Sequence, residues 1–182
     1  MITESNIQLI VFQDEDVILF TQWLEKDYIY KWFCCNGDES EEVRISGQSE
    51  KQEWLNEVID REDNPHRHLF IVLCDGMKIG FGICIDLSGE PEYTAEQYPD
   101  LGGRIKPGEA LELGYCIGEE EYLNKGIGKI IVKKLEDKCC ELGAYLVLAD
   151  PNEKNIPSVK VLLANGFKKF KDGDYRKRLK ML

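Results

Sequence analysis

The chain has 182 residues, a length typical of one domain, and its 43% hydrophobic and 31% charged residues are those of a globular protein. A formal net charge of −11 argues against a nucleic-acid-binding protein, because phosphates require a basic surface. No apolar run approaches the roughly 20 residues of a membrane span. Residues 1–6 also lack the basic and apolar parts of a secretory signal. We therefore expect one cytoplasmic domain over residues 1–182, with no nucleic-acid or membrane partner.

The seven cysteines include two adjacent pairs, Cys34-Cys35 and Cys139-Cys140, and no C-x-x-C spacing. This pattern indicates reduced thiols rather than a disulfide framework or a zinc site. His66 and His68 are the only histidines, so we expect no metal. Seven Lys or Arg against two Asp in residues 164–182 leave the rest of the chain more acidic still. An acidic body favours a cationic partner, although solubility alone also accounts for it.

The hydrophobic pattern predicts mixed strands and helices in chain order. Predicted strands cover 7–12, 69–74, 78–87, 110–117 and 144–149, and a final hairpin covers 167–170 and 175–182. The Asp75-Gly76 pair predicts a tight turn inside the first hairpin. Predicted helices start near Asp14 and cover 48–61, 126–142 and 155–165. The polar residues 88–108 read as one long loop, which suggests the wall of a binding site. The predicted class is α+β, with one twisted, mostly antiparallel sheet.

The strongest chemical signal is the segment Asn124-Lys125-Gly126-Ile127-Gly128-Lys129 between a strand and an amphipathic helix. Two glycines let the backbone approach a ligand closely, and a helix N-terminus offers unpaired N–H groups to a pyrophosphate. The segment lacks the G-x-x-x-x-G-K-[ST] pattern of a nucleotide-binding P-loop and the third glycine of a dinucleotide fingerprint. A second motif follows at Asn155-x-x-Ser158, with Gly166-Phe167 eleven and twelve residues after the asparagine.

This order of strand, glycine loop, helix, strand and N-x-x-[AS] resembles the acetyl-coenzyme A-binding core of the GNAT acetyltransferase superfamily. The resemblance implies a GNAT-like mixed sheet with helices on both faces, and acetyl-CoA as cosubstrate. It implies cofactor contacts from the central strand, the glycine loop and the second motif: Cys116, Ile117, Lys125, Gly126, Ile127, Gly128, Lys129, Asn155 and Ser158. The aromatic segment around Trp32 and the Asp150-Pro151 turn are similar to those of aminoglycoside 6′-N-acetyltransferases. The stretch 112–117 is also similar to acetyltransferases that modify ribosomal-protein N-termini.

Three positions depart from these family patterns. Leu123 stands where Gln or Arg often precedes the first glycine, and Gly114 stands where the drug-modifying enzymes carry an Asp. Leu162 stands where many members carry a tyrosine that protonates the departing thiolate. These departures leave the fold and the cosubstrate in place but put the usual catalytic residues in doubt.

The chemistry requires a neutral amine held beside the thioester, so a carboxylate within reach is the expected base. Glu112 is the candidate, since it lies two residues from Gly114 and shares its strand face. Tyr115 is the candidate acid or substrate contact, and the N–H groups near Cys116 and Ile117 are candidates for stabilising the oxyanion. Trp32 and Phe33 are candidates for the acceptor site.

We therefore expect direct attack in a ternary complex by a primary amine of a small, aminoglycoside-like or polyamine-like cation. The alternatives are acetylation of peptide or protein N-termini, and a catalytically weak acyl-CoA-binding module. Either a monomer or a homodimer fits the sequence.

Overall fold

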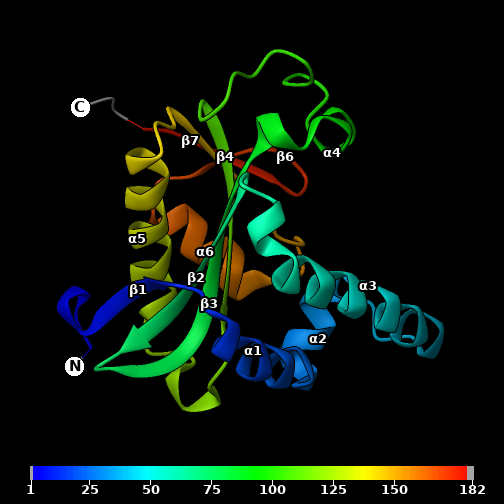
Figure 1. The fold of residues 1–182 in the computed structure, drawn as a ribbon, viewed down its shortest axis with the longest axis vertical. Coiled ribbons are helices and arrows are strands. Elements are labelled where there is room, and N and C mark those ends of the chain that lie inside the picture. Colours follow the sequence, from blue (N-terminus) through cyan, green and yellow to red (C-terminus); the bar gives the residue numbers. More distant parts are fainter. Residues whose placement is uncertain (1, 180–182) are drawn as a thin grey trace.

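The computed structural model describes residues 2–179 and forms a seven-stranded sheet with helices on both faces (Figure 1). The strands are β1 (Ile7–Val11), β2 (Arg67–Cys74), β3 (Met77–Asp86), β4 (Ala110–Ile117), β5 (Leu146–Ala149), β6 (Lys168–Lys171) and β7 (Asp174–Arg178). The helices are α1 (Val17–Leu24), α2 (Asp27–Phe33), α3 (Glu41–Ile59), α4 (Pro91–Gln97), α5 (Ile127–Glu141) and α6 (Ile156–Ala164).

The sheet runs in the order β1-β2-β3-β4-β5-β7-β6, and only the β4–β5 pair is parallel. The β2–β3 hairpin turns at Asp75 and Gly76, which have φ angles of 49° and 82°. Both residue types tolerate this left-handed conformation, so the predicted tight turn is confirmed. The predicted mixed, mostly antiparallel sheet is confirmed as well.

Two hydrophobic cores lie on opposite faces of the sheet. On one face Ile127, Ile131 and Leu135 of α5 pack against strand residues that include Leu111 and Leu113. On the other face α1, α2 and α3 contribute residues such as Phe20, Trp23, Ile29 and Val58, which pack against Phe81 and Ile83. The apolar spacing in α5 places a continuous stripe on the sheet, which is the usual reason for such a helix to form. The stripe is fully buried, because α5 lies against β4, β3 and β1 of the sheet.

The structure differs from the sequence prediction in two segments. Helix α3 begins at Glu41, earlier than the predicted start at Gln48, and Glu41 and Glu42 occupy its first turn, where acidic residues stabilise the helix dipole. Its early turns carry few apolar residues and a glycine, so periodicity alone missed them. The predicted loop 88–108 contains α4, a helix too short for a periodic signal that begins with Pro91 in its first turn.

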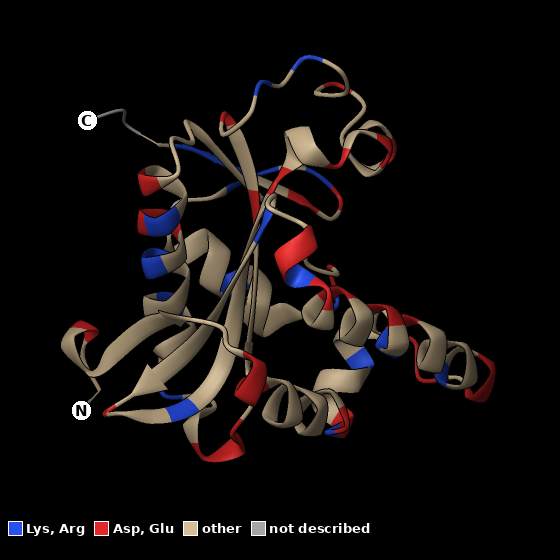
Figure 2. Ribbon diagram, viewed as in Figure 1, with Lys and Arg blue, Asp and Glu red and all other residues tan. Residues whose placement is uncertain are grey.

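The C-terminal hairpin is shorter than predicted at both ends, and the predicted strand end at 180–182 lies outside the described residues. No helix in residues 2–179 is long and apolar enough to cross a membrane. Charges are unevenly distributed over the molecule: acidic residues recur along α3, whereas lysines and arginines concentrate on α5 and the final hairpin (Figure 2).

Strands β4 and β5 stay paired over only three residues. Their register joins Ala110, Leu111 and Glu112 to Leu146, Val147 and Leu148. Strand β4 then continues to Ile117, whereas β5 ends at Ala149 and the chain turns towards α6. The edge of β4 beyond Glu112 is therefore open towards β5, and this opening positions the candidate active site.

Candidate active site

Strand β4 divides the site into two sides, because its side chains alternate between the faces of the sheet. Leu111 and Leu113 pack in the core beneath α5, and Tyr115 packs against the same core. Glu112 and Gly114 therefore face the opposite side, the one that α1 to α3 cover, and Cys116 joins the core there. The two candidate catalytic side chains, Glu112 and Tyr115, thus lie on opposite faces of one strand.

The glycine loop lies at the N-terminus of α5. Asn124 and Gly126 have φ angles of 59° and 76°, so the chain turns sharply before the helix begins at Ile127. No side chain caps this helix, which leaves its first N–H groups available. A helix terminus of this kind, with glycine at its start, fits a pyrophosphate. The Lys125 ammonium lies 5.6 Å from the Tyr122 ring centroid.

Tyr115 lies between the glycine loop and α6. A Cβ atom built on Gly128 would lie 3.0 Å from the Tyr115 hydroxyl, so any larger residue at this position would press on the ring. Burial raises the pKa of Tyr115 to about 12, and a hydrogen bond with Ser158 opposes the rise. The Asn155 side chain caps α6 by accepting from the Ser158 amide at 3.3 Å. The structure therefore brings Tyr115, Gly128 and the Asn155–Ser158 motif together.

The backbone of β4 offers N–H groups to the opening. A Cβ built on Gly80 of β3 would lie 2.1 Å from the Cys116 carbonyl oxygen, so the Cys116 peptide groups face β3. Because backbone groups alternate along a strand, the amides of Tyr115 and Ile117 face away from β3. Of the two predicted positions near the oxyanion, the geometry favours Ile117.

A cleft of about 1000 Å³ runs along the open edge of β4, and residues from both faces of the strand line it, Glu112 on one side and Tyr115 on the other. The predicted acceptor residues Trp32 and Phe33 both line it, together with Trp54 of α3. Six carboxylates line the same cleft, against only two basic side chains, Arg67 and Lys154. The carboxylates are Glu50, Glu53, Glu57, Glu112, Asp150 and Glu153. The cleft is therefore strongly acidic.

Glu50 and Glu53 form no ion pair within residues 2–179. Burial, followed by the charge of Glu53, raises the pKa of Glu50. Glu57, one further turn along α3, pairs with Arg67. Two adjacent and unneutralised carboxylates therefore face the cleft from α3, in a position suited to an ammonium group.

Glu112 lies at the floor of the cleft and is only 6% exposed. Its Oε2 atom accepts hydrogen bonds from the hydroxyls of Tyr93 and Tyr98, each at 2.9 Å. Burial, together with the nearby charge of Asp150, raises the pKa of Glu112 well above its ordinary value. Asp150 follows directly after β5, and because Leu148 of β5 pairs with Glu112, the Asp150 carboxyl group lies beside that of Glu112.

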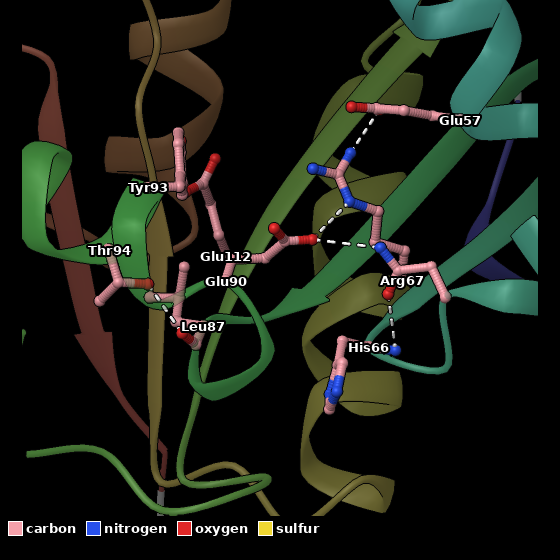
Figure 3. A network of polar contacts seen from close by, with 9 residues as sticks. Glu57, His66, Arg67, Leu87, Glu90, Tyr93, Thr94 and Glu112 are labelled. Carbon is pink, nitrogen blue, oxygen red and sulfur yellow. Dashed lines mark hydrogen bonds and ion pairs between the residues drawn. The ribbon is translucent and has the colours of Figure 1, made fainter. Parts of the chain in front are cut away.

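The two tyrosines come from the segment that the sequence predicted as a loop. Helix α4 carries Tyr93, and Tyr98 follows its last residue. Arg67 of β2 fixes the start of α4, because its Nε donates to Glu90 at 2.8 Å while its terminal nitrogen pairs with Glu57 (Figure 3). On the far side, Arg176 of β7 pairs with Asp100 through two hydrogen bonds of 2.7 and 2.8 Å. The segment predicted as a binding-site wall therefore contains a helix, and ion pairs on both sides fix its position.

Sequence reasoning missed Tyr93, Tyr98, Asp150 and the acidic face of α3 as site residues. The spacing of Glu50, Glu53 and Glu57 at three and four residues was a readable signal for one helix face. Glu41 and Glu42 lie in the first turn of α3 and do not line the cleft. The Asp150-Pro151 turn was noted in the sequence only as a family resemblance, and its role beside Glu112 depends on the β4–β5 pairing.

Solved structures of acetyltransferases share this fold. The aminoglycoside acetyltransferase AAC(6′)-Ib, in complex with ribostamycin and coenzyme A, matches with a TM-score of 0.69 and 16% identity over 95% of this chain and 93% of that one. An aminoglycoside N(6′)-acetyltransferase from Legionella pneumophila matches with a TM-score of 0.64 and 16% identity, over 96% and 91% of the chains. A domain from Methanocaldococcus jannaschii matches with a TM-score of 0.66 and 22% identity, over 95% and 98%. No curated protein sequence matches significantly.

The split between β4 and β5, with an uncapped helix terminus beside it, defines an acyl-CoA-dependent acetyltransferase fold. The family model described as "Acetyltransferase (GNAT) domain" matches residues 6–168. The chain therefore belongs to the GNAT acetyltransferase family and is an N-acetyltransferase whose cosubstrate is acetyl-CoA.

Proposed function

We propose that this enzyme acetylates a primary amine of a small cationic acceptor that carries more than one ammonium group. The observation that supports this proposal is the cleft beside β4, where six carboxylates face two basic side chains. Arg67 is already paired with Glu57 and Glu90, so the negative charge of Glu50, Glu53 and Asp150 remains available. Opposite charge raises both the local concentration and the association rate of a cation.

The aromatic side chains of the cleft support the same acceptor. Trp32, Phe33 and Trp54 line the wall that also carries Glu50 and Glu53. The rings of Phe33 and Trp54 meet edge to face at 5.6 Å, which fixes both. Aromatic faces attract cations and pack against apolar ring or chain carbons. A cleft of about 1000 Å³ is also large enough for a drug-sized acceptor.

The residues of the chain divide the work of the transfer between the two sides of β4. When bound, acetyl-CoA supplies the thioester carbonyl carbon. The first N–H groups of α5, with Gly126, Gly128 and Lys129, are suited to hold its pyrophosphate. The Ile117 amide is placed to stabilise the developing oxyanion. Glu112 and Asp150 form the acid–base centre that removes the proton of the attacking amine.

On the cosubstrate side of β4, the side chain proposed to act in the transfer is Tyr115, through its hydroxyl group. The helix position where many family members carry a tyrosine is Leu162, a core residue that is 1% exposed. Tyr115 reaches the neighbourhood of Ser158 and Gly128 from the strand instead. It is thus the proposed proton donor to the departing sulfur.

The test is thiol release from acetyl-CoA with a panel of amines. The panel contains kanamycin, spermidine, a monoamine of similar size and a short neutral peptide with a free N-terminus. We expect the multiply charged amines to give the highest kcat/KM, and we expect their advantage to fall with ionic strength because exposed charges are screened over about 10 Å at 0.1 M salt. A preference for the neutral peptide, independent of salt, would instead support N-terminal acetylation. Acetyl-CoA binding without turnover of any amine would support a binding module.

A further inference from the structure

The carboxyl groups of Glu112 and Asp150 lie together at the floor of the cleft, in unlike surroundings. Glu112 is 6% exposed and lies in the middle of the sheet. Asp150 keeps an exposed surface that opens into the cleft, although protein surrounds it. A molecule in the cleft can therefore reach Asp150 far more easily than Glu112.

The hydrogen bonds of Glu112 fix where a proton can lie. Both tyrosine hydroxyls donate to the same oxygen, Oε2. No side chain of residues 2–179 donates a hydrogen bond to the other oxygen, Oε1, so this oxygen is free to share a proton with the neighbouring Asp150. Two carboxylates in contact cannot both be ionised without a large repulsion, so one of them must donate a hydrogen bond to the other. A proton on Oε1 of Glu112 satisfies all three neighbours of this side chain at once.

No positive charge neutralises the pair directly. Within residues 2–179, no Lys, Arg or His forms an ion pair with Glu112 or Asp150. The guanidinium of Arg67 is held by Glu57 and Glu90 (Figure 3). Asp174 of β7, whose charge acts on Asp150, is fully buried and is paired with Arg176. The groups that face the pair are therefore two tyrosines and one further carboxylate.

We propose that Glu112 and Asp150 hold one proton between them, that this proton resides on Glu112, and that Asp150 is the catalytic carboxylate that accepts the proton of the attacking amine. This proposal rests on the proposed function and divides the roles within its acid–base centre. Glu112 is then a positioning residue, which orients Asp150 through its O–H group and is itself held by Tyr93 and Tyr98. The roles differ from the assignment of Glu112 as the base, which the sequence suggested.

The proton and electron balance of the step is complete without a further reactant. The amine nitrogen forms a bond to the acetyl carbon, and one N–H proton passes to the Asp150 carboxylate. The C–S bond breaks, the sulfur keeps the electron pair, and it takes a proton from Tyr115 or from water. Asp150 then returns its proton to water in the cleft, to which it is open, and Tyr115 regains its own from the same source.

The dependence on pH follows from Asp150. The protein groups around Asp150 remove part of its hydration and so raise its pKa to about 6, and the hydrogen bond from Glu112 limits the rise. Below about pH 6 Asp150 is protonated and cannot accept a proton, so kcat/KM should fall. Above this pH Asp150 is ionised and kcat/KM should reach a plateau with respect to this group.

The test compares Asp150→Asn, Glu112→Gln and Glu112→Ala. Asp150→Asn should lower kcat/KM by about 10²–10⁴-fold, the usual value of general-base catalysis, and should abolish the inflection near pH 6. Glu112→Gln places a neutral amide that can accept from both tyrosines and donate to Asp150, so it should cost only about tenfold and keep the inflection. Glu112→Ala removes these contacts and should lose clearly more activity than Glu112→Gln.

Acetyl-CoA binding by calorimetry should be unchanged in the Asn and Gln variants, which shows that the fold and the cosubstrate site are intact. A loss of 10²–10⁴-fold in Glu112→Gln, with Asp150→Asn close to wild type, would overturn the proposal and make Glu112 the base.

The position of the proton can be measured without any catalytic turnover, so it can be tested independently of the proposed function. Carbon-13 NMR of the side-chain carboxyl groups, assigned with the same variants, should show Glu112 still protonated at pH 7 and one proton taken up by Asp150 near pH 6. Both groups ionised at pH 7 would overturn the shared proton, even in an enzyme that acetylates cationic amines. If the wild type acetylates no amine of the panel, the proposed function fails, and the NMR titration still decides the position of the proton.

Discussion

The cosubstrate side and the acceptor side of strand β4 differ in how far apart their residues lie in the sequence. The cosubstrate side depends on short stretches of sequence: a glycine loop, the helix that follows it, and an asparagine that caps α6 within three residues. The acceptor side is assembled from α2, α3, α4, β4 and the turn after β5. The difference shows why members of one family can share a cosubstrate while their acceptor sites vary: the first site is local and the second depends on how distant segments pack.

The largest effect is expected from a change on the cosubstrate side, at Gly126. Gly126→Asp should weaken acetyl-CoA binding by about 100-fold or more, because a like charge beside the pyrophosphate costs several kcal/mol and 1.4 kcal/mol corresponds to a factor of ten. Isothermal titration calorimetry measures this directly. Kanamycin binding to the acceptor cleft should change little.

Gly76→Asp is the matched control for Gly126→Asp. Both glycines have positive φ angles, 82° and 76°, and a Cβ built on either would meet no atom within 4 Å. The two substitutions therefore impose a similar backbone strain, but Gly76 lies in the β2–β3 turn. Equal loss of acetyl-CoA binding in both variants would show that strain, rather than charge at the loop, is responsible.

A smaller effect is expected where the two sides meet, at Tyr115. Tyr115→Phe should lower kcat by about 10²-fold, at the low end for acid–base catalysis, since water can replace the hydroxyl as proton donor. The KM for the acceptor should remain nearly constant, because Tyr115 faces away from Glu112. The check is steady-state kinetics with each substrate varied in turn. A rise in the acceptor KM with kcat unchanged would make Tyr115 a substrate contact instead.

The smallest effect is expected on the acidic face of α3. The double change Glu50→Gln and Glu53→Gln should raise the KM for kanamycin by about 3- to 10-fold with little change in kcat, since attraction before the chemical step is uniform binding. The difference from wild type should narrow as salt is added, which initial rates at several ionic strengths will measure.

Glu41→Gln with Glu42→Gln is the control for the α3 variant. It removes the same charge from the same helix, but neither residue lines the cleft. We expect the KM for kanamycin to stay within about twofold of wild type, because these exposed charges are screened over about 10 Å at 0.1 M salt. An equal rise of KM in both double variants would show that overall charge, rather than the lining of the cleft, attracts the acceptor.

The sequence by itself determined the sheet, the glycine loop before α5 and the acidic character of the protein. Strand periodicity, the Asp75-Gly76 turn, the glycines at 126 and 128 and the Asn155 cap are local signals, since each depends on residues within a few positions of one another. Trp32 and Phe33, which the sequence offered as acceptor contacts, line the cleft, and their contact with an acceptor stays a prediction.

Only the tertiary structure decided the acid–base centre. Asp150 meets Glu112 because β4 and β5 pair in parallel at Glu112 and Leu148, which fixes two carboxylates that lie 38 positions apart in the sequence. Tyr93 and Tyr98 reach Glu112 because Arg67 and Arg176 hold α4 from two distant strands. Such contacts depend on register and on long-range ion pairs, and these have no signature in a short stretch of sequence.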